Sequence, residues 1–358
     1  MLADLVEFVV GVDTHKRRHT AALVAANGGL IDSLEVPATA AGYRQLLNWV
    51  EGQGNAPRAW AIEGTSSYGA GLTSHLQERS EWVIEVDCPK RPARRKGSAK
   101  SDPIDAVRAA REALSKDVFA SPRQRGQRES LRALQTTREG AVNARTKSLN
   151  QLHALVVTAP EVLRGTLRGL SSTELVRHCA RLRRPSRGDV ELDTYVGLLR
   201  GIARRALALE AEAKVYYQQI DQLTQTMASE LRDELGVGPI SAAQILISWS
   251  HPGRVRSEAA FASLAGVAPI EASSGQHTRH RLNPGGDRQL NRALHNVANN
   301  RMRHHQETRE YVERRTREGK AEREIRRCLK RYLARYFFKL LERAAAEQTF
   351  AVTLEFAA

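Results

Sequence analysis

The hydrophobic pattern of the chain changes character near residue 125. Before that point, residues 5–37 hold three short runs of apolar and β-branched residues, with a basic turn at residues 16–18 and "NGG" at 27–29. These runs predict a three-stranded meander. Strands that alternate with helices after a meander favour a mixed α/β sheet. The expected later elements are a helix at about 40–52, a strand at 58–63, a helix at about 68–79 and a strand at 82–87.

Beyond residue 125 the pattern is typical of long, charged helices. Its clearest feature is an apolar seam in which the spacing alternates between four and three residues, a heptad pattern that predicts a coiled coil. The partner of this seam is either a second chain or the helix expected around 128–157, and the sequence leaves both open. The Arg-rich stretch 160–190 ends in "RRPSRGD", which is interpreted as a turn between antiparallel helices. The seam consists of Tyr195, Leu199, Ile202, Ala206, Leu209, Ala213, Tyr216, Ile220, Leu223 and Met227.

The last part of the chain opens with "LGVGPISAAQILI", from about residue 233. A Gly-x-Gly turn before an apolar helix is typical of helix–hairpin–helix modules, whose backbone amides can hold a DNA phosphate. A small apolar helix at 258–269, a polar stretch at 270–289 and basic helices to about 345 are expected to follow. The predicted organisation is an α/β domain at 1–125, a helical coiled-coil linker at 126–232 and a mostly helical domain at 233–358.

The charge of the chain favours a polyanionic partner. The sequence has 55 Lys and Arg against 40 Asp and Glu, which gives a net charge of +15. Nucleic acid is the usual partner of so basic a protein. The segment 88–101, "CPKRPARRKGSAKS", is rich in Lys and Arg and predicts a mobile basic loop. Aromatic residues make up only 5% of the chain, so stacking on bases is not expected to be a prominent mode of binding.

Cysteine usage and hydropathy place the chain in the cell interior. Cys88, Cys179 and Cys328 are far apart and have no zinc-ligand spacing, so they are interpreted as reduced and structural. The apolar N-terminus carries Asp4 and Glu7, which favours a strand over a signal peptide. No uncharged run reaches the roughly 20 residues of a membrane span. We expect a soluble, cytoplasmic and nucleoid-associated protein without a membrane partner.

Four acidic residues stand at strand ends or at a helix start. Asp13 ends the first strand, Glu63 ends the fourth, and Asp102 and Asp105 open a helix on one of its faces. Each has an ordinary interpretation as a turn or capping residue, and Pro103 suits the first helical position. Together they stand where α/β sheets build their sites. Carboxylates are ligands for hard cations, so the set predicts a metal site for phosphodiester chemistry.

Six stretches of the chain resemble one family. "GVDTHK", "AIEGTSSYG" and "KSDPIDAVRAA" are similar to the motifs of the RuvC-like, RNase H-like domain in DEDD insertion-sequence transposases. This group includes the Piv-type DNA invertases and the bridge-RNA-guided recombinases. "LGVGPISAAQIL", "FASLAGVAPIEASSGQ" and "HRLNPGGDRQLNRAL" resemble the C-terminal serine transposase domain of the same family. The matches occur in the same order over nearly the whole chain.

The resemblance implies a catalytic set and its partners. Asp13, Glu63, Asp102 and Asp105 would be catalytic ligands of a divalent metal, with two Mg²⁺ ions expected, and Ser274 would be the nucleophile, with Ser273 as the alternative. A serine that attacks phosphorus would join the protein to DNA and free a 3′-hydroxyl. The family also implies donor and target DNA, a structured guide RNA, and a homodimer or higher homo-oligomer that completes the site between chains.

Basic residues lie near both parts of this catalytic set in the sequence. One group is next to the acidic pair and the other follows the serine, so both are expected to neutralise phosphates of the nucleic acid. The expected nucleic-acid-binding residues are Arg91, Arg94, Arg95, Lys96, Lys100, Arg279, Arg281, Arg288 and Arg292.

Two other functions remain open at the level of sequence. A Holliday-junction-type endonuclease would use the four carboxylates and water, and would form no covalent protein–DNA intermediate. A non-catalytic, nucleic-acid-binding coiled-coil protein would use the same acids only as caps and turns. An Asp102→Asn substitution in that protein would change stability by roughly 1 kcal/mol, as the loss of a cap does.

Overall fold

The computed structural model describes residues 1–54, 56–86, 102–183, 189–271, 280–281 and 283–357. For Asp102, His280 and residues 348–357 it describes the backbone alone. Contacts between Cα atoms divide the chain into two compact units. Unit 1 comprises Met1–Gln124 and Gly253–Val255, and unit 2 comprises Arg125–Pro252 and Arg256–Ala358.

Unit 1 is built on a five-stranded mixed sheet with the order β3-β2-β1-β4-β5. The strands β1 (Phe8–Thr14), β2 (Arg18–Ala25) and β3 (Leu30–Pro37) form the expected antiparallel meander, preceded by a short helix, η1 (Leu2–Asp4). β4 (Arg58–Glu63) runs parallel to β1, and β5 (Val83–Val86) runs parallel to β4. The prediction of a mixed α/β sheet is therefore confirmed, and the arrangement is compatible with a RuvC-like domain.

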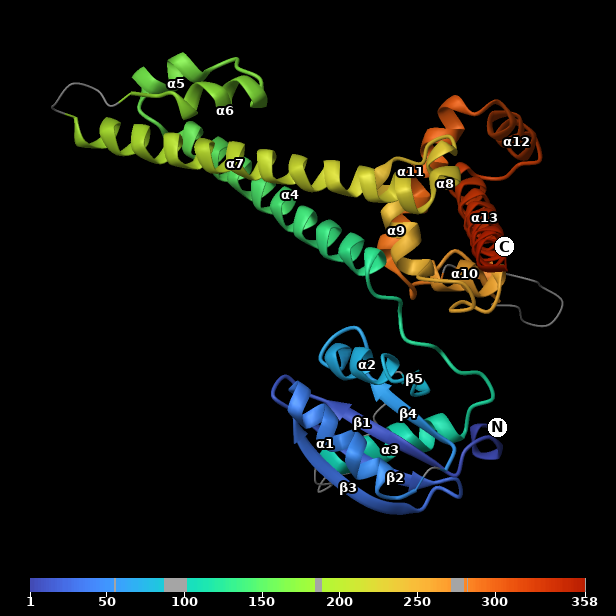
Figure 1. The fold of residues 1–358 in the computed structure, drawn as a ribbon. Helices are drawn as coiled ribbons and strands as arrows, with labels where there is room; N and C mark the ends of the chain where they lie inside the picture. The colour runs from blue at the N-terminus through green and yellow to red at the C-terminus, as the bar shows by residue number, and fades with distance from the viewer. Residues whose placement is uncertain (55, 87–101, 184–188, 272–279, 282, 358) are drawn as a thin grey trace. The chain divides into compact units, whose positions relative to one another are not determined.

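Helices cover both faces of this sheet (Figure 1). α1 (Ala40–Glu51) and α2 (Ala70–Gln77) share one core with Trp60 of β4. α3 (Asp102–Leu114) shares the other core with Val9 of β1, and most of its buried side chains are alanines. Because alanine adds little thickness to a helix, α3 can lie unusually close to the strands.

The closest approach of α3 to the sheet is at Gly11 of β1. A Cβ atom at this position would lie 2.0 Å from the carbonyl oxygen of Ala106 and 2.7 Å from the amide nitrogen of Ala110. Those two atoms belong to the helix backbone, so they cannot move aside as the end of a flexible side chain could. Gly11 therefore sets the distance between the central strand and α3.

The direction of α3 is opposite to that of β1. The C-terminal side of the helix lies near the start of the chain, where the Leu2 amide donates to the Lys116 carbonyl oxygen at 3.3 Å. Ala106, nearer the start of the helix, lies against Gly11 further along β1. The first turn of α3 is consequently on the side of the sheet where β1 ends.

A stack of three aromatic rings fills part of the other core. The His19 ring on β2 is fully buried and lies parallel to Tyr43 of α1, with 5.7 Å between the ring centroids. Tyr43 also contacts His75 of α2 at 5.7 Å. Burial lowers the pKa of His19, so its ring is neutral in the folded protein at pH 7.

Unit 2 begins with two long helices that pack along each other in opposite directions. α4 (Gln127–Thr158) and α7 (Val190–Met227) are joined by a hydrogen bond of 3.0 Å from the Tyr195 hydroxyl to Thr158 and by an ion pair of 3.3 Å between Arg145 and Glu210. All ten residues of the heptad seam are buried or half-buried. α4 of the same chain is thus a partner of this seam, whereas a supercoil and an additional contact with a second chain stay predictions.

The Arg-rich stretch 160–190 contains more than the expected turn. It forms α5 (Glu161–Leu167) and α6 (Ser172–Ala180), which lie against the ends of α4 and α7 (Figure 1). Leu163, Leu175 and Cys179 are buried in a core shared with the two long helices. Most of the predicted turn "RRPSRGD" lies outside the described residues.

The helix α9 (Pro239–Trp249) is buried and packs against α4, α7, α8 (Ser229–Asp233) and α11 (Arg288–His304). Unit 2 also contains α10 (Glu258–Leu264), β6 (Ile270–Glu271), β7 (His280–Arg281), α12 (Gln306–Arg317) and α13 (Glu322–Ala357). No helix in the described part of the chain combines the length and the apolar character that crossing a membrane requires.

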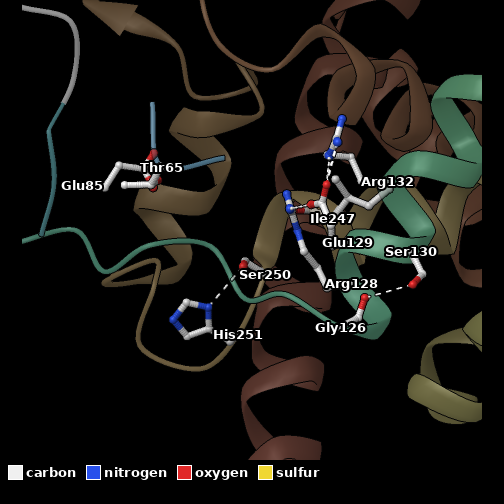
Figure 2. Close-up of polar contacts among 10 residues, drawn as sticks. All are labelled: Thr65, Glu85, Gly126, Arg128, Glu129, Ser130, Arg132, Ile247, Ser250 and His251. Carbon is white, nitrogen blue, oxygen red and sulfur yellow. Dashed lines mark hydrogen bonds and ion pairs between the residues drawn. The ribbon is translucent and has the colours of Figure 1, made fainter. Parts of the chain in front are cut away.

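Arg128 anchors α4 to the end of α9. Its guanidinium is almost fully buried, with 1% of the side chain exposed, and donates to the Ile247 carbonyl oxygen at 3.2 and 3.0 Å (Figure 2). Glu129 pairs with the same group at 3.0 Å. The last carbonyl oxygens of a helix have no partner within the helix and need hydrogen-bond donors from elsewhere. A cation at this C-terminal end also interacts favourably with the negative end of the helix dipole.

We predict that Gly11→Ala destabilises unit 1 by about 3 kcal/mol, since the added methyl group must displace helix backbone. Urea denaturation followed by tryptophan fluorescence measures this loss, because Trp49, Trp60 and Trp82 of the four tryptophans lie in unit 1. Gly52→Ala is the matched control: Gly52 has a φ of −63°, and the nearest atoms to its Cβ position are at 3.5 Å. Equal stability of the two variants would contradict the close packing.

The pKa of His19 predicts a loss of stability in acid. An unfolded histidine titrates near pH 6.5, whereas the buried ring resists protonation, so the unfolded chain binds more protons below that pH. The free energy of unfolding should therefore fall as the pH drops from 7 to 5, by up to about 1.4 kcal/mol per pH unit. His19→Phe keeps the ring stack and should give a shallower slope. Identical slopes in the two proteins would refute the assignment to His19.

Candidate active site

Two carboxylates stand at the same level on neighbouring parallel strands. β1 and β4 pair with Val12 beside Ile62, and one further step of this register sets Asp13 beside Glu63. The residues two positions earlier in each strand face α3, so by alternation both carboxylates are on the α3 face. Neighbouring strands are about 4.8 Å apart, which brings the two groups within reach of a shared cation.

The first turn of α3 completes this arrangement. From Gly11 to Asp13 the strand advances by about 6.6 Å. From Ala106 back to Asp102 the antiparallel helix advances by about 6 Å. The start of α3, where a helix was expected to begin, therefore lies level with the end of β1. Asp105 is in this turn and half-buried, and the Asp102 side chain lies outside the described residues.

A hydrogen bond between side chain and backbone ties the two strand ends together. The Thr14 hydroxyl donates to the Glu63 carbonyl oxygen at 2.9 Å, one residue beyond the paired part of the strands. A second bond of 2.8 Å runs from the Thr65 hydroxyl to the Glu85 carboxylate (Figure 2). These contacts fix the edge of the sheet from which the acidic side chains project.

A histidine and an arginine lie beside two of the carboxylates. The Asp13 side chain is 12% exposed, and one of its oxygens is 3.3 Å from Nε2 of His15. Asp105 accepts a hydrogen bond of 2.8 Å from Arg108, one turn further along α3. The Arg108 cation stabilises the negative charge of Asp105, and the His15 ring can donate a hydrogen bond to Asp13.

The donor set of this edge fits a hard divalent cation. All of its acidic groups offer carboxylate oxygens, the ligands that Mg²⁺ and similar ions prefer. Among the described side chains, no group of three or more possible ligands forms a cluster. Asp13, Glu63 and Asp105 are therefore not gathered into such a cluster, and the binding of a cation by these residues together with Asp102 stays a prediction.

The proposed nucleophile belongs to a hairpin in unit 2. β6 and β7 pair with Ile270 opposite Arg281 and Glu271 opposite His280, so they hold together the two ends of the segment 272–279. Ser273, Ser274 and Arg279 lie in that segment, outside the described residues. The structure thus describes the base of the hairpin that carries the predicted serine.

Backbone contacts between two glycine-containing turns fix this base. The segment after α10 and the segment before α11 approach so closely that a Cβ on Gly266 would lie 2.5 Å from the Gly285 carbonyl oxygen. A Cβ on Gly286 would lie 2.6 Å from the Leu264 carbonyl oxygen. Both glycines have a positive φ, +65° for Gly266 and +89° for Gly286, which other residues rarely adopt. The two turns therefore form one rigid support for the hairpin.

A chain of hydrogen bonds connects this support to the long helix α4. The Asp287 carboxylate accepts from the amides of the first turn of α11 at 2.9 and 3.0 Å, and also from the Ser248 hydroxyl at 2.6 Å. Gln244 of α9 donates to Ser248 at 3.1 Å, and Gln135 of α4 donates to Gln244 at 2.6 Å. Three helices thus share one largely buried polar network.

The residues expected to bind nucleic acid have different surroundings. Arg281 and Arg288 are exposed. Arg292 is also exposed but forms an ion pair of 2.8 Å with Glu139 of α4, which links α11 to the long helix. The other predicted contacts of this kind lie outside the described residues: Arg91, Arg94, Arg95, Lys96, Lys100 and Arg279.

Sequence reasoning did not identify Gly11 or the polar network. A glycine inside the β-branched run "FVVGVDT" was a usable signal, since it often marks a close approach of backbone. The network of Gln135, Gln244, Ser248 and Asp287 had no such signal, because each residue is ordinary in its own segment and the four meet only in the fold.

We predict that Asp287→Ala destabilises unit 2 by about 2 kcal/mol, since it removes the cap of α11 and leaves Ser248 without its acceptor. Asp287→Asn should be milder, because asparagine caps a helix nearly as well as aspartate. Thermal unfolding followed by circular dichroism compares both variants with the original protein. Equal losses of stability in the two variants would show that the side-chain oxygen that caps α11 is not the source of the stabilisation.

The models of two protein families match the chain. Residues 10–159 match the DEDD transposase family of IS110, and residues 228–313 match the transposase IS116/IS110/IS902 family. A search of curated proteins gave no match. Transposases of these families cut and rejoin DNA, and DEDD domains use divalent metal ions. The chain therefore carries the two transposase domains of the IS110 family, which support a DNA transposase of an insertion sequence.

Proposed function

We propose that this transposase cuts and rejoins DNA by a metal-assisted transesterification in which Ser274 is the nucleophile. The observation that supports it most is the register of β1 and β4, which sets Asp13 level with Glu63 where α3 begins. If these acids served only as caps and turns, nothing would require Asp13 and Glu63 to stand level with each other on neighbouring strands.

In this proposal the four acidic residues bind two Mg²⁺ ions. Asp13 and Glu63 contribute from the strand ends, and Asp102 and Asp105 from the first turn of α3. Bound divalent cations would polarise the phosphodiester and stabilise the negative charge of the transition state. His15 and Arg108 orient the carboxylates of Asp13 and Asp105 through the contacts described above.

The Ser274 hydroxyl carries out the covalent step. Its Oγ attacks phosphorus and loses its proton, while the bond from phosphorus to the 3′-oxygen breaks and that oxygen gains a proton. The products are a phosphoserine link to the 5′ end and a free 3′-hydroxyl. Attack by a 3′-hydroxyl of another strand reverses the step and rejoins DNA. Because the number of phosphate ester bonds is unchanged, no external energy source is needed. Ser273 is the alternative nucleophile.

The proposed partners are donor DNA, target DNA, a structured guide RNA and further copies of the chain. The net charge of +15 supports binding to nucleic acid. The guide RNA and a site completed between chains rest on the resemblance to bridge-RNA-guided recombinases. A homodimer or higher homo-oligomer would keep an isolated chain from cutting.

We predict that Ser274→Ala abolishes the covalent protein–DNA adduct in cells that carry the insertion sequence with its ends and flanking non-coding DNA. Asp13→Asn and Glu63→Gln should lower adduct formation by at least about 100-fold, since losing even an outer partner of a metal ligand can cost that much. The adduct is measured by trapping protein-linked DNA after denaturing lysis, and its site is mapped by mass spectrometry.

Two control variants make the result specific. Ser273→Ala should keep the adduct, and Glu35→Gln removes an exposed carboxylate of β3 that pairs with Arg18 and should leave adduct formation unchanged. DNA cleavage by Ser274→Ala without an adduct would indicate an endonuclease that uses water. An adduct on Ser273 would mean that Ser273, and not Ser274, is the nucleophile.

A further inference from the structure

Unit 2 contains a cavity of about 320 Å³ at the base of the β6–β7 hairpin. It is lined by the segment Gly266, Val267, Ala268 and Pro269, which leads into β6, and by Arg281 of β7. The opposite wall comes from α13 and the residues just before it. Its volume is at the lower end of the range for small-molecule sites.

The walls of the cavity are strongly cationic. Five basic side chains and a single carboxylate line it: Arg281, Lys320, Arg327, Lys330, Arg331 and Glu324. Arg327 and Arg331 are exposed and one turn apart on α13, so both can direct their guanidinium groups to one ligand. Desolvation, together with the positive charges of Arg327 and Arg326, lowers the pKa of Lys330, which indicates a positive local field.

Part of the lining is apolar. Val267 is buried, Ala268 is half-buried, and Cys328 of α13 is half-buried. A small inorganic anion would satisfy the cations and leave this apolar wall in contact with water. A nucleotide offers both a phosphate and a flat, largely apolar base, so it matches the two kinds of lining.

Lys330 holds the cavity wall in place. Its ammonium group donates to Asn291 of α11 at 2.9 Å, and the Asn291 amide nitrogen donates to the Ala265 carbonyl oxygen at 2.8 Å. Ala265 directly precedes the segment that lines the cavity. The cavity is thus built on the same support that fixes the base of the hairpin.

We propose that this cavity binds one nucleotide of the DNA strand that approaches the hairpin, with its phosphate at Arg281, Arg327 and Arg331 and its base against Val267 and Cys328. The proposal rests on the proposed function for the choice of DNA as the ligand. It adds a positioning site that holds the strand next to the segment with the nucleophile. Guanidinium groups suit this task because they bind phosphate with two parallel hydrogen bonds.

Cys328 provides a native reporter of occupancy. The test measures the alkylation rate of Cys328 in the full-length protein by mass spectrometry, with and without a mixed-sequence single-stranded oligodeoxynucleotide. The oligodeoxynucleotide should slow alkylation several-fold. Inorganic phosphate at the same phosphate concentration should not, and a matched oligoribonucleotide should protect less.

The double substitution Arg327→Gln and Arg331→Gln tests the phosphate contacts. Both side chains are exposed, so the fold should persist, and circular dichroism checks this. The affinity for a fluorescently labelled oligodeoxynucleotide should fall by at least about tenfold. The slope of log K against log salt concentration should become shallower by about 1.4, since each phosphate contact on a single strand contributes about 0.7. Protection of Cys328 should be lost.

A matched control carries the same change of charge on α12. Arg309 and Arg317 are exposed and do not line the cavity, so Arg309→Gln with Arg317→Gln should change binding by less than about twofold. The cavity proposal would be overturned if both double variants lost binding equally. It would also be overturned if phosphate protected Cys328 as well as the oligodeoxynucleotide does, if RNA protected it better, or if nothing protected it.

Measuring Cys328 protection and adduct formation together in the unsubstituted protein separates this proposal from the proposed function. Protection of Cys328 without an adduct on any serine would leave the cavity proposal standing and refute the covalent mechanism. An adduct on Ser274 in a protein whose Cys328 is not protected would refute the cavity proposal alone.

Discussion

The contact between α3 and the central strand at Gly11 is the constraint on which the acidic site depends. Only a residue without a side chain allows the backbone of a helix to lie directly on β1. A Cβ added at Gly11 would lie 2.0 Å from the Ala106 carbonyl oxygen. The alanines on the inner face of α3 extend the same close packing along the helix. Because strand and helix are antiparallel, this contact fixes how near the first turn of α3 comes to Asp13 and Glu63. A displacement of even one ångström there would change which oxygens can share a cation.

Unit 2 uses the same principle in a different place. Gly266 and Gly286 let two turns meet backbone to backbone, and the network from Gln135 to Asp287 joins these turns to the long helices. The bonds of this network that join different helices depend on the relative placement of those helices, although the buried Oε1 of Gln135 has no partner among the described residues. The segment 272–279 therefore leaves from a base that packing and hydrogen bonds determine. Binding and catalytic residues on loops depend on rigid supports of this kind.

Much of the fold of unit 1 could be predicted from the sequence, because its strands and helices carry strong local periodicity. The meander, α1, β4, α2, β5 and the start of α3 all occur where the pattern placed them. The stretch 160–190 was less predictable: its many arginines hid two short amphipathic helices whose leucines are buried by α4 and α7. The candidate acidic residues could be chosen from their places at strand ends, but their common level could not, since the β1–β4 register joins segments 50 residues apart. The cavity could not be predicted for the same reason, because the segment 266–269, β7 and α13 meet only in three dimensions.

The most direct test of the account is to locate the metal within the folded protein. With added hydrogen peroxide as oxidant and ascorbate as reductant, Fe²⁺ bound in place of Mg²⁺ generates hydroxyl radicals that cut the nearby backbone, and mass spectrometry maps the cuts. The account predicts cuts at the ends of β1 and β4 and in the first turn of α3, suppressed by excess Mg²⁺ and absent from Asp13→Asn. Cuts confined to other segments, or cuts at these positions that persist in Asp13→Asn, would contradict the claim that the acids of three elements form one metal site.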